Sequence, residues 1–327
     1  MKQITVTNDM ASQRLDKYLQ RLLPSCPKSL IYKQLRKKNI TLNSSKATGN
    51  ELIKAGDVIS VFFSDETYDK FASGDAVNTS VYEKAFETLK GIVPVYEDER
   101  ILVFNKPAGV LSQSVERADL SVNEYLIGYL LSKGTVSKES LNHFKPSVCN
   151  RLDRNTSGLI LCSKTFEGAR YLSDKIRDKD LEKYYLALVS GYFKGPSVDI
   201  KYVIKDEKEN KLKFVTENTS GAMMIKTGFE AVKCCDDISL VKVRLYTGKS
   251  HQIRAHLSHL GYPILGDRKY GNEKTNKKYP KIKNQLLHAW ILKFNDLPDG
   301  FEELSGKRIM ADYPNDFNQF MDDVEDF

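Results

Sequence analysis

Residues 149–164 read CNRLDRNTSGLILCSK, and the rest of the chain is organised around this stretch. It begins with polar residues, as a loop does, and continues into the apolar run Leu159–Cys162, which indicates a buried strand. Asp153 lies between Arg151 and Arg154, and opposite charges nearby stabilise a carboxylate. An ionised aspartate beside a rigid strand could act as a nucleophile or a base. Taken alone, these three residues favour a structural ion pair, because such networks are common without catalysis.

The order of residues in this stretch resembles a known family signature. Arg151-Leu152-Asp153, then Thr-Ser-Gly-Leu, a strand and Ser-Lys are similar to the signature of the RluA-type pseudouridine synthases. In that family the aspartate is catalytic, so the resemblance implies a catalytic role for Asp153. The family usually has histidine before the arginine, where this chain has Asn150.

Two further motifs follow in the family's order. Residues 183–191 (KYYLALVSG) resemble the second motif, which implies that Tyr185 stacks on an extracted base with its phenol placed for proton transfer. Tyr184 is the competing assignment, but in a strand it would face the opposite side. Residues 247–256 (TGKSHQIRAH) resemble the third motif and imply that Arg254 pairs with Asp153. Lys249 stands where arginine is commoner in the family.

The remaining pocket residues follow from the same resemblance. Arg151 is expected to fill the gap that the flipped base leaves. Ile253, Leu287 and the strand that begins at Leu159 are expected to form a dry pocket wall. Residues 287–289 (LHA) match the closing strand of the family.

Metal and cofactor chemistry finds little support in the sequence. His251, His256 and His259 suggest a metal site, but there is no HExxH pattern and no CxxC pair. Phosphate-binding GxGxxG and GxxxxGK[ST] loops and a GxSxG elbow are also missing. The resemblance implies a reaction without metal or organic cofactor.

The N-terminal residues carry the excess positive charge. Residues 1–63 hold 11 Lys and Arg against 4 Asp and Glu, so the net charge of +7 is reached there and the rest is balanced. Two short helices and two short strands over residues 12–62 resemble the RNA-binding module of ribosomal protein S4, the alpha-L motif. Lys33, Arg36 and Lys37 fall on one exposed helix side and are the expected phosphate contacts. A solvated charged face is the alternative reading.

The predicted fold class is α+β. We expect an S4-like domain at 1–63, a linker at 64–84, a catalytic domain at 85–311 and an acidic tail at 312–327. The catalytic domain is expected to hold a bent, mixed, mostly antiparallel sheet with a central cleft. The tail is expected to fray or to pack loosely through Phe317 and Phe320.

Composition indicates a folded core and the cellular compartment of the protein. Hydrophobic residues make up 41% of the 327, which is enough for a sizeable core. Five scattered cysteines favour a reducing cytoplasm, and no apolar run is long enough to span a membrane. We predict a monomer that isomerises uridine to pseudouridine in RNA, and we expect its target to be 23S ribosomal RNA. The alternatives are a synthase acting on transfer RNA and a non-catalytic RNA-binding or ribosome-assembly factor.

Overall fold

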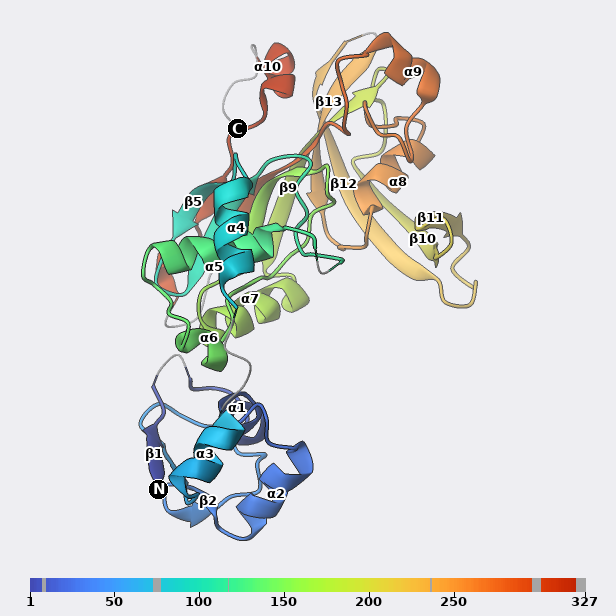
Figure 1. The fold of residues 1–327 in the computed structure, drawn as a ribbon. Coiled ribbons are helices and arrows are strands. Elements are labelled where there is room, and N and C mark those ends of the chain that lie inside the picture. Colours follow the sequence, from blue (N-terminus) through green and yellow to red (C-terminus); the bar gives the residue numbers. More distant parts are fainter. Residues whose placement is uncertain (8–9, 73–77, 117, 236, 296–300, 322–327) are drawn as a thin grey trace.

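The computed structural model describes residues 1–7, 10–72, 78–116, 118–235, 237–295 and 301–321. They form a small N-terminal head and a larger body, seen at the bottom and the top of Figure 1. Each part has a sheet of its own. No helix within these residues combines the length and apolar character that a membrane crossing needs.

The head is built on an antiparallel sheet in the order β1-β4-β2-β3. Leu15 and Leu19 from one helix and Ile31 and Leu35 from the next have helical spacing, and all four are buried in the core of the head. The first elements of the head are β1 (Lys2–Thr5), α1 (Leu15–Leu22), α2 (Lys28–Arg36), β2 (Ile40–Leu42), β3 (Ser45–Lys46) and β4 (Val58–Val61). The predicted two helices and two following strands are thus present.

The segment 64–84 differs from the linker that we expected. It holds helix α3 (Asp65–Ala72) and the start of helix α4 (Ser80–Thr88). Tyr68 and Phe71 pack against the core of the head, so α3 belongs to the head. The spacing of Tyr68, Phe71 and Ala72 at i, i+3 and i+4 was the signal for this helix. Part of the segment, residues 73–77, lies outside the described residues.

The body contains an 11-stranded mixed sheet in the order β11-β10-β12-β13-β9-β14-β8-β6-β5, with β15 and β7 pairing at its side. This arrangement is the mixed, mostly antiparallel sheet that the sequence predicted. Its strands are β5 (Val93–Glu97), β6 (Ile101–Lys106), β7 (Ser147–Val148), β8 (Ser157–Ser163), β9 (Leu181–Ser190), β10 (Val198–Asp206), β11 (Lys211–Val215), β12 (Met223–Cys234), β13 (Ile238–Leu245), β14 (Leu287–Phe294) and β15 (Arg308–Met310).

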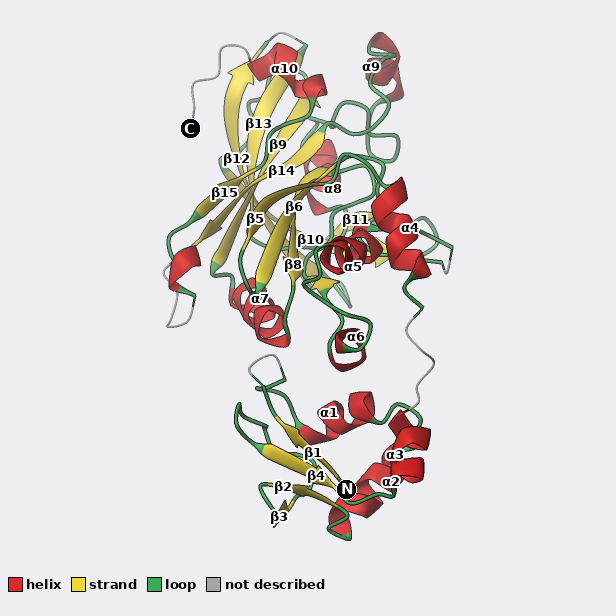
Figure 2. Cartoon of the chain, turned by 60° about the vertical axis from the view of Figure 1, so that its left-hand side comes forward, coloured by secondary structure: helices red, strands yellow, loops and turns green. Residues whose placement is uncertain are grey.

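Helices pack around this sheet, as Figure 2 shows for α5 and α7. Helix α5 begins after Ser121, whose hydroxyl accepts a hydrogen bond from the backbone N–H of Asn123 as an N-cap does. The helices of the body are α4, α5 (Val122–Ser132), α6 (Ser140–His143), α7 (Phe166–Asp178), α8 (Gln252–His259), α9 (Glu273–Lys278) and α10 (Asn315–Met321), with a 3₁₀ turn at Glu302–Leu304.

The sheet divides into two halves where β8 meets β14. These strands pair in parallel through only two residue pairs, His288 with Ser157 and Ala289 with Gly158. Farther along, the same edge of β14 pairs with β15. Strands β8, β6 and β5 therefore form one half of the sheet, on one side of β14. Strands β9, β13 and β12 belong to the other half, on the opposite side of β14. Among the described strands this is the one parallel pair.

Gly158 allows this close crossing. Its φ of +108° is one that residues with a side chain rarely adopt, and a Cβ atom built there would lie 2.1 Å from the carbonyl oxygen of Ala289. Any side chain would push β8 away from β14. The glycine of the Thr-Ser-Gly sequence is thus explained by the junction of the two half-sheets, five residues after Asp153.

The acidic C-terminal segment is partly folded and packs through Phe317, which is one of the two outcomes expected for it. Phe317 on α10 is 1% exposed and packs in the cluster that contains Trp290 and Leu286. The side chain of Phe320 lies outside the described residues.

Candidate active site

The loop that carries Asp153 is tied down by hydrogen bonds on both sides of the aspartate. The Ser112 hydroxyl donates to the carbonyl oxygen of Leu152 (2.8 Å) and accepts from its N–H (2.9 Å). The Lys106 ammonium donates to the carbonyl oxygen of Arg154 (3.0 Å). The backbone of Asp153 therefore has a defined position, and its carboxylate is 25% exposed.

Lys106 is buried at the end of β6 and holds this loop to the preceding one. Its ammonium also donates to the carbonyl oxygens of Pro107 (3.0 Å) and Val110 (2.8 Å). Burial lowers the pKa of Lys106 to about 7, and the charge of Asp153 opposes this shift. Lys106 is followed in sequence by Pro-Ala-Gly, as at a turn, and its contact with the Asp153 loop was not predicted.

Arg254, on helix α8, contacts two carboxylates. Its Nη1 donates to Oδ2 of Asp153 at 2.7 Å, while Nε and Nη2 donate to the two oxygens of Asp267 at 2.7 and 2.9 Å. Burial acts to lower the pKa of Arg254, but the hydrogen bonds and charges of Asp267 and Asp153 outweigh it and raise that pKa. The predicted pairing of Arg254 with Asp153 is therefore present in the structure.

Asp267 is the residue that fixes the guanidinium. Its side chain is fully buried, and Oδ1 also accepts from the backbone N–H groups of Lys269 (2.8 Å) and Tyr270 (3.0 Å). Burial would raise the pKa of Asp267, yet the hydrogen bonds and charge of Arg254 hold it below the usual value. The sequence analysis did not predict a role for this carboxylate.

The arginines next to Asp153 in sequence do not pair with it in the structure. Arg154 turns away, and its Nε donates to the carbonyl oxygen of Gly109 at 3.0 Å. Arg151 is exposed, and no ion pair within the described residues joins it to Asp153. The reading of Asp153 as one member of a local ion pair with its neighbours is therefore wrong. Its cationic partner comes from a helix 101 residues away.

Tyr185 faces the same space from strand β9. In the sheet it lies opposite Ala289 of β14, and Ala187 lies opposite Leu287, so the register places Tyr185 beside the crossing of β8 and β14. Burial, and then the charge of Asp153, raises the pKa of Tyr185. Tyr184 points to the other face of β9, where its hydroxyl donates to Glu182.

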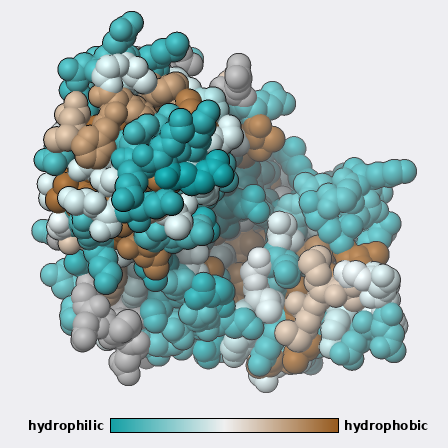
Figure 3. All heavy atoms as spheres, turned by 90° about the horizontal axis from the view of Figure 1, so that it is seen from below, coloured by the Kyte–Doolittle hydropathy of each residue, from teal (hydrophilic) through white to brown (hydrophobic). Residues whose placement is uncertain are grey.

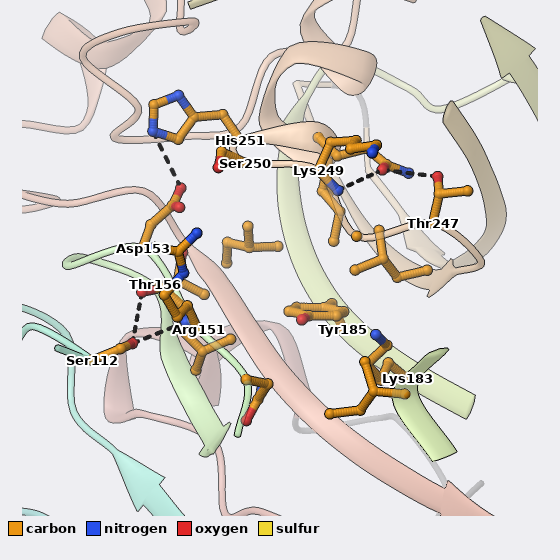
Figure 4. Close-up of a pocket in the computed structure, with 18 of the residues that line it drawn as sticks. Ser112, Arg151, Asp153, Thr156, Lys183, Tyr185, Thr247, Lys249, Ser250 and His251 are labelled. Carbon is orange, nitrogen blue, oxygen red and sulfur yellow. Dashed lines mark hydrogen bonds and ion pairs between the residues drawn. The ribbon is translucent and has the colours of Figure 1, made fainter. Parts of the chain in front are cut away.

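A cavity of about 780 Å³ unites these side chains. Its lining combines the predicted residues of the site: Arg151, Asp153, Tyr185, Ile253, Arg254 and Leu287. Figure 4 shows the ring of Tyr185 in this space, with Asp153, Arg151 and Lys183 around it. Leu159 does not contribute to the wall as expected, because its side chain is buried in the cluster around Ile101 and Leu172.

The three histidines of the third motif lie in different surroundings. His251 Nε2 is 4.0 Å from Oδ2 of Asp153, whereas His256 bonds to Thr227 and Asp199, each at 2.9 Å. His259 stacks on Phe214 with ring centroids 3.9 Å apart. They do not share a ligand position. Within the described residues no group of three His, Cys, Asp or Glu side chains could hold a metal ion.

The predicted phosphate-binding cations Lys33, Arg36 and Lys37 are exposed at the end of helix α2 in the head. None of them lines the cavity in the body. Figure 3 shows the molecule from below. This face is largely hydrophilic, and a hollow separates its left-hand part from its right-hand part.

Asn150 shows how the loop accommodates its departure from the family pattern. Its Oδ1 accepts a hydrogen bond from the N–H of Leu161 at 2.6 Å, which ties the start of the loop to strand β8. The amide therefore anchors the signature stretch to the strand that follows it.

Comparison with known proteins agrees with this arrangement. Residues 100–259 match the family model described as RNA pseudouridylate synthase, and residues 13–59 match the S4 domain. A relative from Rickettsia bellii, named ribosomal large subunit pseudouridine synthase C, is 36% identical and covers 88% of this chain and 90% of its own. The protein of the same name from Vibrio cholerae is 29% identical over 89% of this chain and 88% of its own length.

A solved structure supports the fold of the body. Human RNA pseudouridylate synthase domain containing 4 superimposes with a TM-score of 0.56 at 23% identity, over 75% of this chain and 95% of the human chain. At this identity the likeness concerns the fold.

Proposed function

From the premise that this chain belongs to the RNA pseudouridylate synthase family and is a pseudouridine synthase, we propose that its target is a uridine of large-subunit (23S) ribosomal RNA and that Asp153 performs the essential chemistry. The observation that carries the assignment of Asp153 is its hydrogen bond with Arg254 inside a cavity that Tyr185 also lines.

The reaction is an isomerisation, in which the N1–C1′ bond of uridine breaks and a C5–C1′ bond forms. The uracil loses its C5 proton and gains one at N1, so no atom is gained or lost overall. The base must leave the RNA stack before an enzyme can reach these atoms. A cavity of about 780 Å³ is large enough for a nucleoside.

Each side chain of the cavity has a role suited to that chemistry. Asp153 would act on the ribose, either at C1′ or on its neighbouring proton, and both routes need a carboxylate held in place. Arg254 provides that position through a charge-assisted hydrogen bond. Tyr185 would stack on the uracil, and its raised pKa keeps the phenol protonated for proton transfer.

The other lining residues complete the site. Ile253 and Leu287 offer apolar wall, and both are nearly buried. Arg151, exposed at the rim two residues before Asp153, would occupy the gap that the flipped base leaves in the RNA. The exposed cations Lys33, Arg36 and Lys37 would hold RNA phosphates at a distance from the cavity.

The choice of RNA rests on the relatives. The relatives from Rickettsia bellii and Vibrio cholerae carry the name of a ribosomal large subunit pseudouridine synthase and align with 88% and 89% of this chain. We therefore extend that target to this chain. A monomeric state and a cytoplasmic location remain predictions of the sequence.

The test is a map of pseudouridines in RNA from cells with and without this protein. We expect specific pseudouridines of 23S RNA to disappear without the protein and to be restored by purified enzyme alone. Loss of pseudouridine from transfer RNA instead would reject the proposed target, and an unchanged map would reject the proposed role in the cell.

A further inference from the structure

A second cavity, of about 420 Å³, adjoins the first at Arg254, which lines both. This second cavity is lined by the Gly266–Lys269 turn, the segment before β14, the start of β11 and Asn155 of the Asp153 loop. Its lining residues are Asn155, Lys211, Arg254, Gly266, Arg268, Lys269, Lys283, Asn284 and Gln285.

The composition of this lining is one-sided. Five of the nine residues are cationic, three carry amides and the ninth is a glycine. Neither a carboxylate nor an apolar side chain is among these described residues. The first cavity, by contrast, has Tyr185, Ile253 and Leu287 in its wall. The second cavity therefore suits a small anion, and none of its lining residues offers an aromatic ring on which a base would stack.

Two of the five cations of this cavity have carboxylate partners, since Lys211 lies 3.5 Å from Glu209 and Arg254 contacts Asp153 and Asp267. The other three, Arg268, Lys269 and Lys283, have no such partner among the described residues. The ammonium of Lys269 donates to the carbonyl of Asn210 (2.7 Å) and that of Lys283 to the carbonyl of Pro280 (2.9 Å). Burial, then the charges of Arg254 and Lys211, lowers the pKa of Lys269, as expected where like charges crowd.

We propose that this second cavity binds a backbone phosphate of the substrate RNA next to the target nucleotide. The proposal rests on the proposed function, because it takes the target uridine to occupy the adjoining cavity. Lysine, arginine and side-chain amides are usual phosphate contacts in nucleic-acid complexes. Since Asn155 belongs to the Asp153 loop and Arg254 contacts Asp153, a phosphate held here would position the ribose beside the carboxylate.

The test compares the double variant R268Q/K283Q with the control variant Lys281→Gln, which removes one neighbouring charge outside the cavity. Lys281 is exposed, lies two residues from Lys283 and is not part of the cavity. Binding of a large-subunit RNA fragment is measured at several salt concentrations. The double variant is expected to bind about tenfold more weakly. Its slope of log affinity against log salt should fall by about 1, which is roughly one phosphate contact. The Lys281→Gln variant should bind as the wild type does.

A second arm separates RNA phosphate from free phosphate. Inorganic phosphate replaces chloride at constant ionic strength, and it should weaken RNA binding by the wild type but not by the double variant. If the double variant, shown to be folded by its unfolding temperature, keeps the wild-type affinity and salt slope, the proposal is rejected. The proposal would also be rejected if inorganic phosphate competed with RNA for the wild type while the double variant kept the wild-type salt slope. That result would indicate a site for free phosphate. Failure of the proposed function is distinct, since then the wild type itself would form no pseudouridine in the fragment.

Discussion

Arg254 donates a 2.7 Å hydrogen bond to Asp153 although 101 residues separate the two in sequence. The same guanidinium is held from behind by the fully buried Asp267. Two carboxylates thus share one arginine, but they differ in exposure. Asp267 serves as the anchor, and Asp153 faces the cavity as the group available to a substrate.

Replacing Asp153 by asparagine should remove turnover and leave RNA binding nearly intact. The amide keeps the size of the side chain but cannot act as a nucleophile or a base. We expect a fall of at least about 10²–10⁴-fold in pseudouridine formation. Chemical mapping of RNA after incubation measures turnover, and filter binding measures affinity. Turnover near the wild-type level would refute the role given to Asp153.

Replacing Asp267 by asparagine should destabilise the protein and lower its activity together. The change leaves a buried guanidinium without its bidentate partner, which costs about 3–5 kcal/mol in the free energy of unfolding. Asp237 is a matched control, because its pair with Lys278 is exposed on both sides and is worth at most about 1 kcal/mol. Urea unfolding of both variants measures the difference.

The stabilising effect of Asp267 should depend on pH in one direction. Its pKa in the folded protein lies below the ordinary 3.8. Its contribution to the free energy of unfolding is therefore complete above pH 3.8 and is lost as the pH falls through the folded-state pKa. The difference in unfolding free energy between wild type and Asp267→Asn should therefore be constant at neutral pH and shrink below about pH 4. A gap that grows on acidification would contradict this account.

Removing the Tyr185 hydroxyl should separate its two proposed roles. Tyr185→Phe keeps the ring for stacking, so RNA affinity should be retained, while turnover falls by about 10²-fold if the phenol transfers a proton. Tyr184→Phe is the matched control, since that hydroxyl bonds Glu182 on the other face of the strand. Equal turnover by both variants would show that the Tyr185 phenol takes no part in the chemistry.

Neutralising the cations at the end of α2 should weaken RNA binding without disturbing the body. The triple variant K33Q/R36Q/K37Q is expected to lower the salt slope by about 2, as two to three phosphate contacts are lost. The triple variant K274Q/K277Q/K278Q on helix α9 makes the same change in net charge on exposed residues elsewhere. If both variants change the slope equally, the effect belongs to net charge and the head has no special part in it.

The sequence alone was sufficient for much of the body. Alternation along residues 181–190 placed Tyr185 and Tyr184 on opposite faces of a strand, because side chains alternate with a period of two whatever the strand packs against. The apolar run after Asp153 likewise predicted β8. Local patterns of this kind depend on backbone geometry, which neighbouring residues determine.

Helix α3 was missed because the polar composition of its segment concealed a few apolar contacts, whereas packing of the C-terminal segment through Phe317 was one of the two outcomes expected. Tyr68 and Phe71 dock on the head, and Phe317 docks on the body. Such docking depends on a surface that other parts of the chain provide. The weak local signal of helical spacing was present at residues 68–72 but was outweighed by charge.

The partners of Asp153 were decided by tertiary structure. Its neighbours Arg151 and Arg154 are two and one positions away, yet Arg151 is exposed to solvent and Arg154 turns toward Gly109. Only the crossing of β8 with β14, and the packing of α8 against β11 and β12, bring Arg254 within 2.7 Å of the carboxylate. An ion pair forms between groups that the folded backbone holds within reach, and sequence distance carries no information on that separation.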